Sequence, residues 1–140
     1  MTKSALPLRL SLAVIGAIIV FLGLDVVLGG MRTMGWMGPT TFIDVADASR
    51  FAIQDNHVRF LGGVWTGLGL VFVAASVAFH TLRITLLVLC ATVVLGGLSR
   101  LTTPEFATLL NMSILPSLIA ELVLFPLLAL WIFKAGHAAT

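Results

Sequence analysis

Four charged side chains stand where the sequence is otherwise apolar. Asp25 and Glu121 lie within apolar runs, and Arg59 and Arg100 lie at the rims of such runs. A charge at the centre of a membrane helix costs about 2.5 to 3.5 kcal/mol on insertion scales, so such charges usually pair or face a polar cavity. Because carboxylates and guanidinium groups form bidentate pairs, we expect Asp25 to pair with Arg59 and Glu121 with Arg100.

Four apolar stretches position these charges, and each stretch carries one of them. A helix that crosses the hydrocarbon core needs about 20 apolar residues, and these runs show no alternation typical of strands. The sequence therefore predicts an all-α integral membrane protein, an up-and-down four-helix bundle that forms a single domain over residues 1–140. The expected spans are about residues 8–29, 57–79, 82–98 and 115–133.

The first apolar run also has to be weighed against a signal peptide, because Lys3 and Arg9 precede or open it. The run is longer than a typical apolar signal core, it carries Asp25, and no Ala-x-Ala cleavage site follows it. We therefore interpret it as an uncleaved membrane helix.

All four charges are expected at one end of the bundle. In an up-and-down topology, the end of the first span lies beside the start of the second, the end of the third and the start of the fourth. At 1.5 Å of rise per residue the two acids lie about 6 to 8 Å below the rim, a depth that arginine side chains reach. Asn56 and His57 fall at the same end, and His57 could shuttle protons or touch a ligand. The sequence thus predicts one polar pocket, with a purely structural ion-pair network as the alternative.

Two connecting segments on this side are expected to hold short interfacial helices. Thr40 or Thr41 follows a Gly-Pro pair and could cap a helix over Phe42 to Gln54. In the second segment, Thr103 could cap a short helix that has Pro104 at its first position and continues into an apolar run. By contrast, the second and third spans are separated only by a tight turn.

Prolines and glycines give further packing information. Pro116 should mark the start of the fourth span, and Pro126 should kink it because proline lacks an N–H donor. Small residues let membrane helices approach closely, and Gly63 and Gly67 have the small-xxx-small spacing. The glycines expected at helix contacts are Gly62, Gly63, Gly67, Gly96 and Gly97.

Composition excludes several classes of function. Hydrophobic residues make up 59% of the chain and charged residues 10%, whereas a soluble domain has about a quarter charged. The net charge of +2 comes from scattered residues, which excludes a nucleic-acid-binding patch. The single Cys90 excludes an internal disulfide. The three histidines are expected on different sides of the membrane, so no metal site is expected, and the sequence does not indicate a cofactor.

Orientation follows from the lysines and arginines near the span ends. If Arg59 and Arg100 serve the charge cluster, four basic residues remain on one side of the membrane and two on the other. We therefore expect both termini in the cytoplasm and the pocket to open outward. The four are Lys3, Arg9, Arg83 and Lys134, and the two are Arg32 and Arg50.

The stretches from Asp55 to Trp65 and from Gly96 to Arg100, together with Glu121, resemble the bacterial four-helix membrane family catalogued as domain of unknown function 4345. That family is similar to the wider DoxX/DoxD-like group. The resemblance implies a compact four-helix bundle in the bacterial inner membrane. Some members of the wider group are associated with quinone-linked redox complexes, which by analogy raises the expectation of a quinone or lipid ligand.

Three functions remain open. The favoured one is a non-enzymatic membrane protein that binds a lipid-like or quinone-like amphipathic molecule in the outward-facing pocket, or an accessory subunit of a larger membrane complex. The second is a membrane enzyme that uses Asp25 or Glu121 as acid or base on a lipophilic substrate. The third is a proton or small-solute transporter acting as a homo-oligomer, which is less favoured because the four short spans lack discontinuous repeats.

Overall fold

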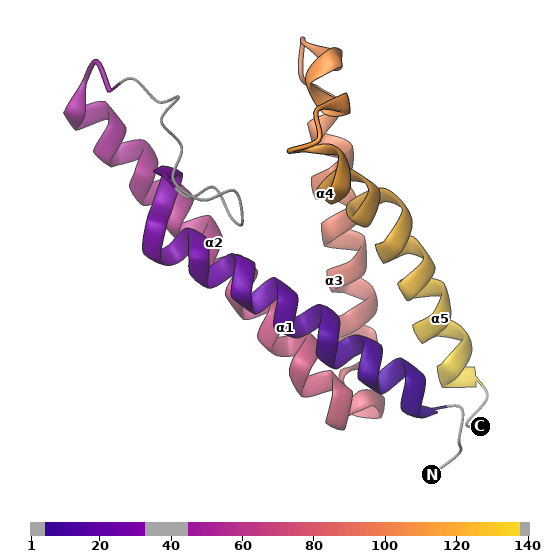
Figure 1. The fold of residues 1–140 in the computed structure, drawn as a ribbon. Helices are drawn as coiled ribbons and strands as arrows, with labels where there is room; N and C mark the ends of the chain where they lie inside the picture. Colours follow the sequence, from indigo (N-terminus) through magenta and orange to yellow (C-terminus); the bar gives the residue numbers. More distant parts are fainter. Residues whose placement is uncertain (1–4, 33–44, 138–140) are drawn as a thin grey trace. The chain divides into compact units, whose positions relative to one another are not determined.

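A computed structural model describes residues 5–32 and 45–137. Every regular element in these residues is helical, and four helices are long and apolar enough to cross a membrane. The expected all-α architecture with four membrane-length helices is therefore confirmed. These helices form two compact units, one over residues 10–77 and the other built mainly from residues 78 onward (Figure 1). The four candidate spans are Leu6–Arg32, Ala48–Val77, Phe79–Arg100 and Leu115–Gly136.

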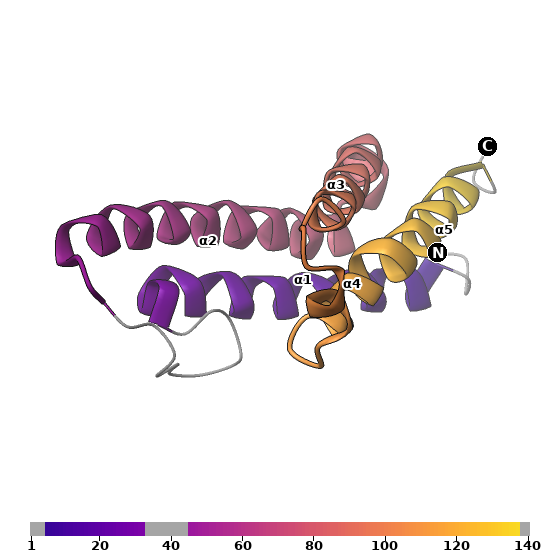
Figure 2. The same cartoon turned by 90° about the horizontal axis from the view of Figure 1, so that it is seen from above.

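The first unit is an antiparallel hairpin of α2 (Ala48–Val77) and the part of α1 (Ala5–Gly29) from Leu10 onward; a short 3-10 turn, η1 (Gly30–Arg32), follows α1. The two helices lie side by side along their length (Figures 1 and 2). Glycines line their contact: a Cβ on Gly16 would lie 2.8 Å from the Gly69 carbonyl oxygen, and one on Gly23 would lie 2.9 Å from that of Gly62. Each helix thus repeats a glycine after seven residues, two helical turns, which lets the backbones approach closely.

The start of α2 corrects the expected organisation of the first long connection. We expected a separate interfacial helix over 42–54 and a second span from 57, but one continuous helix runs from Ala48. Asp47 explains this start, because its Oδ1 accepts hydrogen bonds from the backbone N–H groups of Ser49 (3.0 Å) and Arg50 (3.1 Å), as an N-cap does. The expected caps Thr40 and Thr41 lie outside the described residues.

The second unit pairs α3 (Phe79–Arg100) with the fourth span. That span is α4 (Leu115–Ile119), a π-helical turn η3 (Ala120–Leu124) and α5 (Phe125–His137), which follow one another without a break (Figure 1). Buried residues on α3 recur at alternating intervals of three and four, the spacing of a helix that packs along one seam. They are Leu86, Cys90, Val93 and Gly97 on α3, which packs against the element carrying buried Phe125, Leu128 and Ile132.

The ends of the helices in this unit differ in detail from expectation. Because α3 begins at Phe79, His80 lies in its first turn rather than in a connecting turn. The short helix expected from Pro104 is a 3-10 helix, η2, that spans Phe106–Leu110. Pro116 lies in the first turn of α4, as expected.

The fourth span contains a π turn immediately before Pro126, the residue at which we expected a kink. The Phe125 N–H donates to the carbonyl of Ala120, five residues earlier, so the turn is one residue wider than an α-helical turn. Proline interrupts the regular hydrogen-bond ladder because it has no N–H to donate. The irregular backbone is therefore concentrated in one place, and Glu121 lies within it.

Candidate functional site

The second unit brings Arg100 and Glu121 together in a bidentate ion pair. Arg100 Nε lies 2.7 Å from Glu121 Oε2, and Arg100 Nη2 lies 2.8 Å from Oε1. Glu121 is buried, at 6% exposure, whereas the Arg100 side chain is 40% exposed. The carboxylate is thus enclosed, and the guanidinium closes over it with one side towards the surroundings.

Local backbone structure makes this pair fit. Gly97 lies one turn before Arg100 on α3, and a Cβ there would lie only 2.8 Å from the Cβ of Glu121. The absence of a side chain at Gly97 therefore lets α3 approach η3 closely enough for the pair to form. Single π turns within α-helices occur frequently at functional sites, and this one carries the only buried charged residue recorded among the described residues, Glu121.

The outer edge of the Arg100 guanidinium remains uncommitted. Glu121 engages Nε and Nη2, and within the described part of the chain Nη1 makes no hydrogen bond. Arginine carries five N–H donors in a planar fork, so donors remain for a further acceptor. The arrangement can hold a polar group at the end of a membrane-length helix.

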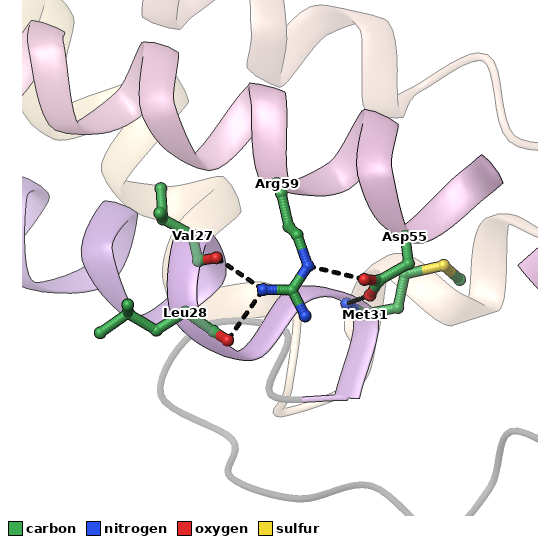
Figure 3. Close-up of polar contacts among 5 residues, drawn as sticks. All are labelled: Val27, Leu28, Met31, Asp55 and Arg59. Atoms are coloured by element: carbon green, nitrogen blue, oxygen red, sulfur yellow. Dashed lines mark hydrogen bonds and ion pairs between the residues drawn. The ribbon is translucent and has the colours of Figure 1, made fainter. Parts of the chain in front are cut away.

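In the first unit, Arg59 forms its ion pair with Asp55, not with Asp25 as expected (Figure 3). Arg59 Nε donates to Asp55 Oδ2 at 2.6 Å, and the two residues lie one turn apart on α2. The expectation was wrong because the second span was taken to begin at 57, which excluded Asp55 from the helix. Asp25 is half-buried on α1.

The Arg59–Asp55 pair caps the end of α1 (Figure 3). Arg59 Nη1 donates to the carbonyl oxygens of Val27 and Leu28, both at 2.8 Å, and the Met31 N–H donates to Asp55 Oδ1 at 2.8 Å. The last carbonyls of a helix lack intrahelical partners, and in a membrane no water replaces those partners. The guanidinium also places a positive charge at the negative end of the helix dipole.

Gly30 makes this cap sterically feasible. Its φ of +61° is in the left-handed region that glycine adopts readily, and such a residue commonly ends a helix. A Cβ on Gly30 would collide with the Asp55 carboxylate. The glycine therefore permits both the left-handed backbone at the end of α1 and the close approach of the Asp55 carboxylate.

A third arginine, Arg83, plays a similar part at the opposite end of α3, although from the sequence we expected it to act only in membrane orientation. Arg83 Nη2 donates to the Phe133 carbonyl oxygen at 2.9 Å, and its guanidinium carbon lies 5.8 Å from the centroid of the Phe133 ring. Gly136, one turn later, leaves room for the guanidinium. The Arg83 contact has a signal in the sequence: a basic residue stands near one end of a membrane helix, where the carboxyl end of another helix is expected.

The remaining candidate residues stand apart from these contacts. Asn56 and His57 are exposed on α2, and among the described residues neither side chain forms a hydrogen bond or ion pair. The two ion pairs belong to different units, Arg59 with Asp55 in one and Arg100 with Glu121 in the other. Convergence of the charges in one layer, with a single pocket between them, stays a prediction.

The glycines divide into two groups. Gly62 packs against α1 and Gly97 packs against η3, as expected for helix contacts. At Gly63, Gly67 and Gly96, in contrast, no atom of the described residues outside the local helix backbone and the adjacent residues lies within 4 Å of the place that a Cβ would occupy. The small-xxx-small spacing of Gly63 and Gly67 therefore does not produce the α1–α2 contact, which falls on Gly62 and Gly69.

The cap on α1 gives a first testable expectation. Replacing Asp55 by Ala leaves the Met31 N–H and Arg59 Nε without their acceptor, so we expect a loss of about 1.5 to 3 kcal/mol in the free energy of unfolding. Amide exchange at Met31 should accelerate. Asp55→Asn keeps an oxygen for the Met31 N–H and should slow that exchange again while still losing the ion pair.

Asn56→Ala is the matched control, because Asn56 is the next residue and is exposed. It should leave both the stability and the Met31 exchange rate unchanged. An Asp55→Ala protein whose Met31 amide exchanges at the wild-type rate would contradict the assignment of the cap.

Among the described residues, no group of three or more His, Cys, Asp or Glu side chains could hold a metal ion.

Comparison with known proteins gives one match, to a family model. No curated protein and no solved structure matched the chain. The model of a family described as a domain of unknown function, DUF4345, matches residues 7–132. With its four membrane-length helices and a match over most of its length, the chain belongs to this family.

Proposed function

We propose that this multi-pass membrane protein is non-enzymatic and binds a lipid-like or quinone-like amphipathic molecule through the outer edge of Arg100. The supporting observation is the geometry of the Arg100 guanidinium. Two of its nitrogens donate hydrogen bonds to buried Glu121, and the side chain is still substantially exposed. Glu121 orients the group, so binding a further acceptor does not require ordering a free arginine side chain.

Charge balance indicates which polar head the site would favour. Arg100 and Glu121 together carry no net charge, so an anionic head would meet the buried carboxylate as well as the guanidinium. A neutral acceptor gains the N–H hydrogen bonds without that repulsion. We therefore favour a carbonyl oxygen, as in a quinone or a lipid ester, over a phosphate.

Apolar side chains around the pair would suit the tail of such a molecule. Leu98 and Leu101 flank Arg100 in the sequence, and Ile119 and Leu124 flank Glu121; all four are exposed. A tail that moves here from the surrounding acyl chains gains little, because lipid is as apolar as leucine. The polar contacts at Arg100 would therefore set both the selectivity and the orientation.

Acid–base catalysis at Glu121 is less well supported. Both of its carboxylate oxygens accept hydrogen bonds from Arg100, and the residue is buried. A general base must lie within hydrogen-bond reach of the proton that it abstracts. A substrate would first have to displace Arg100, which would leave the carboxylate buried without a partner.

Mass spectrometry of co-purifying molecules tests the proposal. The protein would be purified in mild detergent from bacterial membranes, and its extract analysed for quinones and lipids. We expect the wild type to retain one amphipathic species and Arg100→Gln to retain about tenfold less, which corresponds to 1.4 kcal/mol.

Arg50→Gln is the control, because Arg50 is an exposed arginine in an exposed ion pair with Asp47. It should retain as much ligand as the wild type. Equal retention in all three proteins would contradict the role of Arg100, and a retained species dominated by anionic lipid would contradict the preference for a neutral head. A stoichiometric protein partner with no bound amphiphile would instead favour the accessory-subunit role.

Localisation is part of the proposal. We place the protein in the bacterial inner membrane with both termini in the cytoplasm, from the distribution of lysines and arginines. Arg100 and Glu121 would then lie towards the outward-facing leaflet. The likeness to the wider DoxX/DoxD-like group likewise remains an inference from the motifs.

A further inference from the structure

The connection between α3 and α4 exposes large apolar side chains. Phe106 is 63% exposed, Leu110 67% and Met112 76%. Contiguous exposed apolar patches on proteins mark contacts with a membrane or another molecule. In water these three side chains would keep most of their apolar surface hydrated, which is unfavourable.

Several polar groups of this connection form hydrogen bonds within the chain rather than depending on water. The Thr108 hydroxyl donates to the Glu105 carbonyl at 2.7 Å, the Thr102 hydroxyl donates to the Ser99 carbonyl at 2.8 Å, and Asn111 Oδ1 accepts from the Ser113 N–H at 2.9 Å. The two carbonyls also accept the backbone N–H groups of Thr108 and Thr102, so the hydroxyls find their partners within the chain, and Asn111 supplies the partner of the Ser113 N–H. Such internal satisfaction is required wherever backbone lies within a membrane.

Packing fixes this connection against its own hairpin. Leu109, in the middle of η2, is buried at 4% exposure, and η2 contacts α4. The connection lies between two membrane-length helices, the end of α3 at Arg100 and the start of α4 at Leu115 (Figure 1). Its depth is therefore set by the rims of those helices.

From these observations we infer that η2 is embedded in the membrane, with Phe106, Leu110 and Met112 in the acyl-chain region of the leaflet. Continuity along the chain argues for lipid as the occupant: exposed Leu98 lies on the membrane-length helix before this connection, and exposed Ile119 lies on the one after it. The inference requires no ligand at Arg100.

Nitroxide labels test this placement. Single cysteines at Phe106, Leu110 and Met112, in a Cys90→Ala background, would carry the label in vesicles of phosphatidylcholine and phosphatidylglycerol. Molecular oxygen partitions into lipid and a nickel chelate into water, so their collision rates with the label report depth. We expect oxygen to dominate at all three positions and the chelate to dominate at the control Glu105→Cys, an exposed polar neighbour.

Chelate access equal to that at Glu105→Cys would place η2 in water and overturn the inference. Low access to both reagents would show that protein covers the patch, which also overturns it. The unmodified chain provides a second measurement, because a phospholipid with a photoactivatable diazirine in its acyl chain should label residues 106–112. Labelling of α3 and α5 without labelling of this segment would count against the inference.

Discussion

Replacing Arg100 by Gln should lower the free energy of unfolding by about 3 to 5 kcal/mol, the cost of leaving a buried charge without its partner. The reason is the burial of Glu121, which is 6% exposed and accepts both of its close hydrogen bonds from Arg100. Equilibrium unfolding of the protein in bicelles by added SDS would measure the loss.

The reciprocal replacement supplies the control. Glu121→Gln leaves Arg100 unpaired, but this side chain is 40% exposed and can move its charge towards the rim. We therefore expect a smaller loss, and a double Arg100→Gln, Glu121→Gln protein that recovers part of the stability of the Arg100 variant. Equal and additive losses in the two single variants would show that the pair is not coupled.

The Arg100 and Glu121 variants also separate a structural pair from a binding site. A purely structural pair predicts that stability recovers in the double variant and that no bound molecule is lost in any of them. If Arg100 binds a ligand, the double variant regains stability but not the ligand.

Gly69→Ala should destabilise the α1–α2 hairpin, whereas Gly67→Ala, two residues earlier on the same helix, should not. A Cβ on Gly69 would lie 2.7 Å from the Val20 backbone nitrogen and 2.8 Å from the Gly16 carbonyl oxygen. Because both are backbone atoms, the helices must separate, and overpacking of this kind costs about 1 to 3 kcal/mol.

At Gly67 the same substitution is expected to raise the free energy of unfolding. Among the described residues, nothing outside the local helix backbone and the adjacent residues lies within 4 Å of the added methyl group, and alanine stabilises a helix relative to glycine by about 0.5 to 1 kcal/mol. The same unfolding measurement applies to both variants. Equal effects at the two positions would contradict the register in which Gly62 and Gly69 face α1.

Several features of the fold were predictable from single stretches of sequence. The length and apolarity of the four runs predicted four membrane helices, because each helix satisfies its own backbone and needs no information from the rest of the chain. Pro116 correctly marked the start of the fourth span. The pairing of Glu121 with Arg100 was also accessible, since each charge stood alone in its apolar run.

Other features depended on contacts between residues that a local sequence pattern does not identify. The partner of Arg59 was missed because Asp47 starts α2 early and brings Asp55 into the helix one turn before Arg59. Gly62 was expected at a helix contact, but Gly69 was missed in favour of Gly63 and Gly67, because spacing identifies a small face but not the face that a partner occupies.

By itself, then, the sequence determined that the chain crosses a membrane on four helices and that its few intramembrane charges must be compensated, because hydrocarbon penalises each polar group wherever it lies. Only the tertiary structure decided how each arginine is compensated: Arg100 by a buried carboxylate, Arg59 by Asp55 and the carbonyls that end α1, and Arg83 through a carbonyl near the end of α5. The physical reason is that burial acts on one residue at a time, whereas a partner is selected by the register and close approach of two helices.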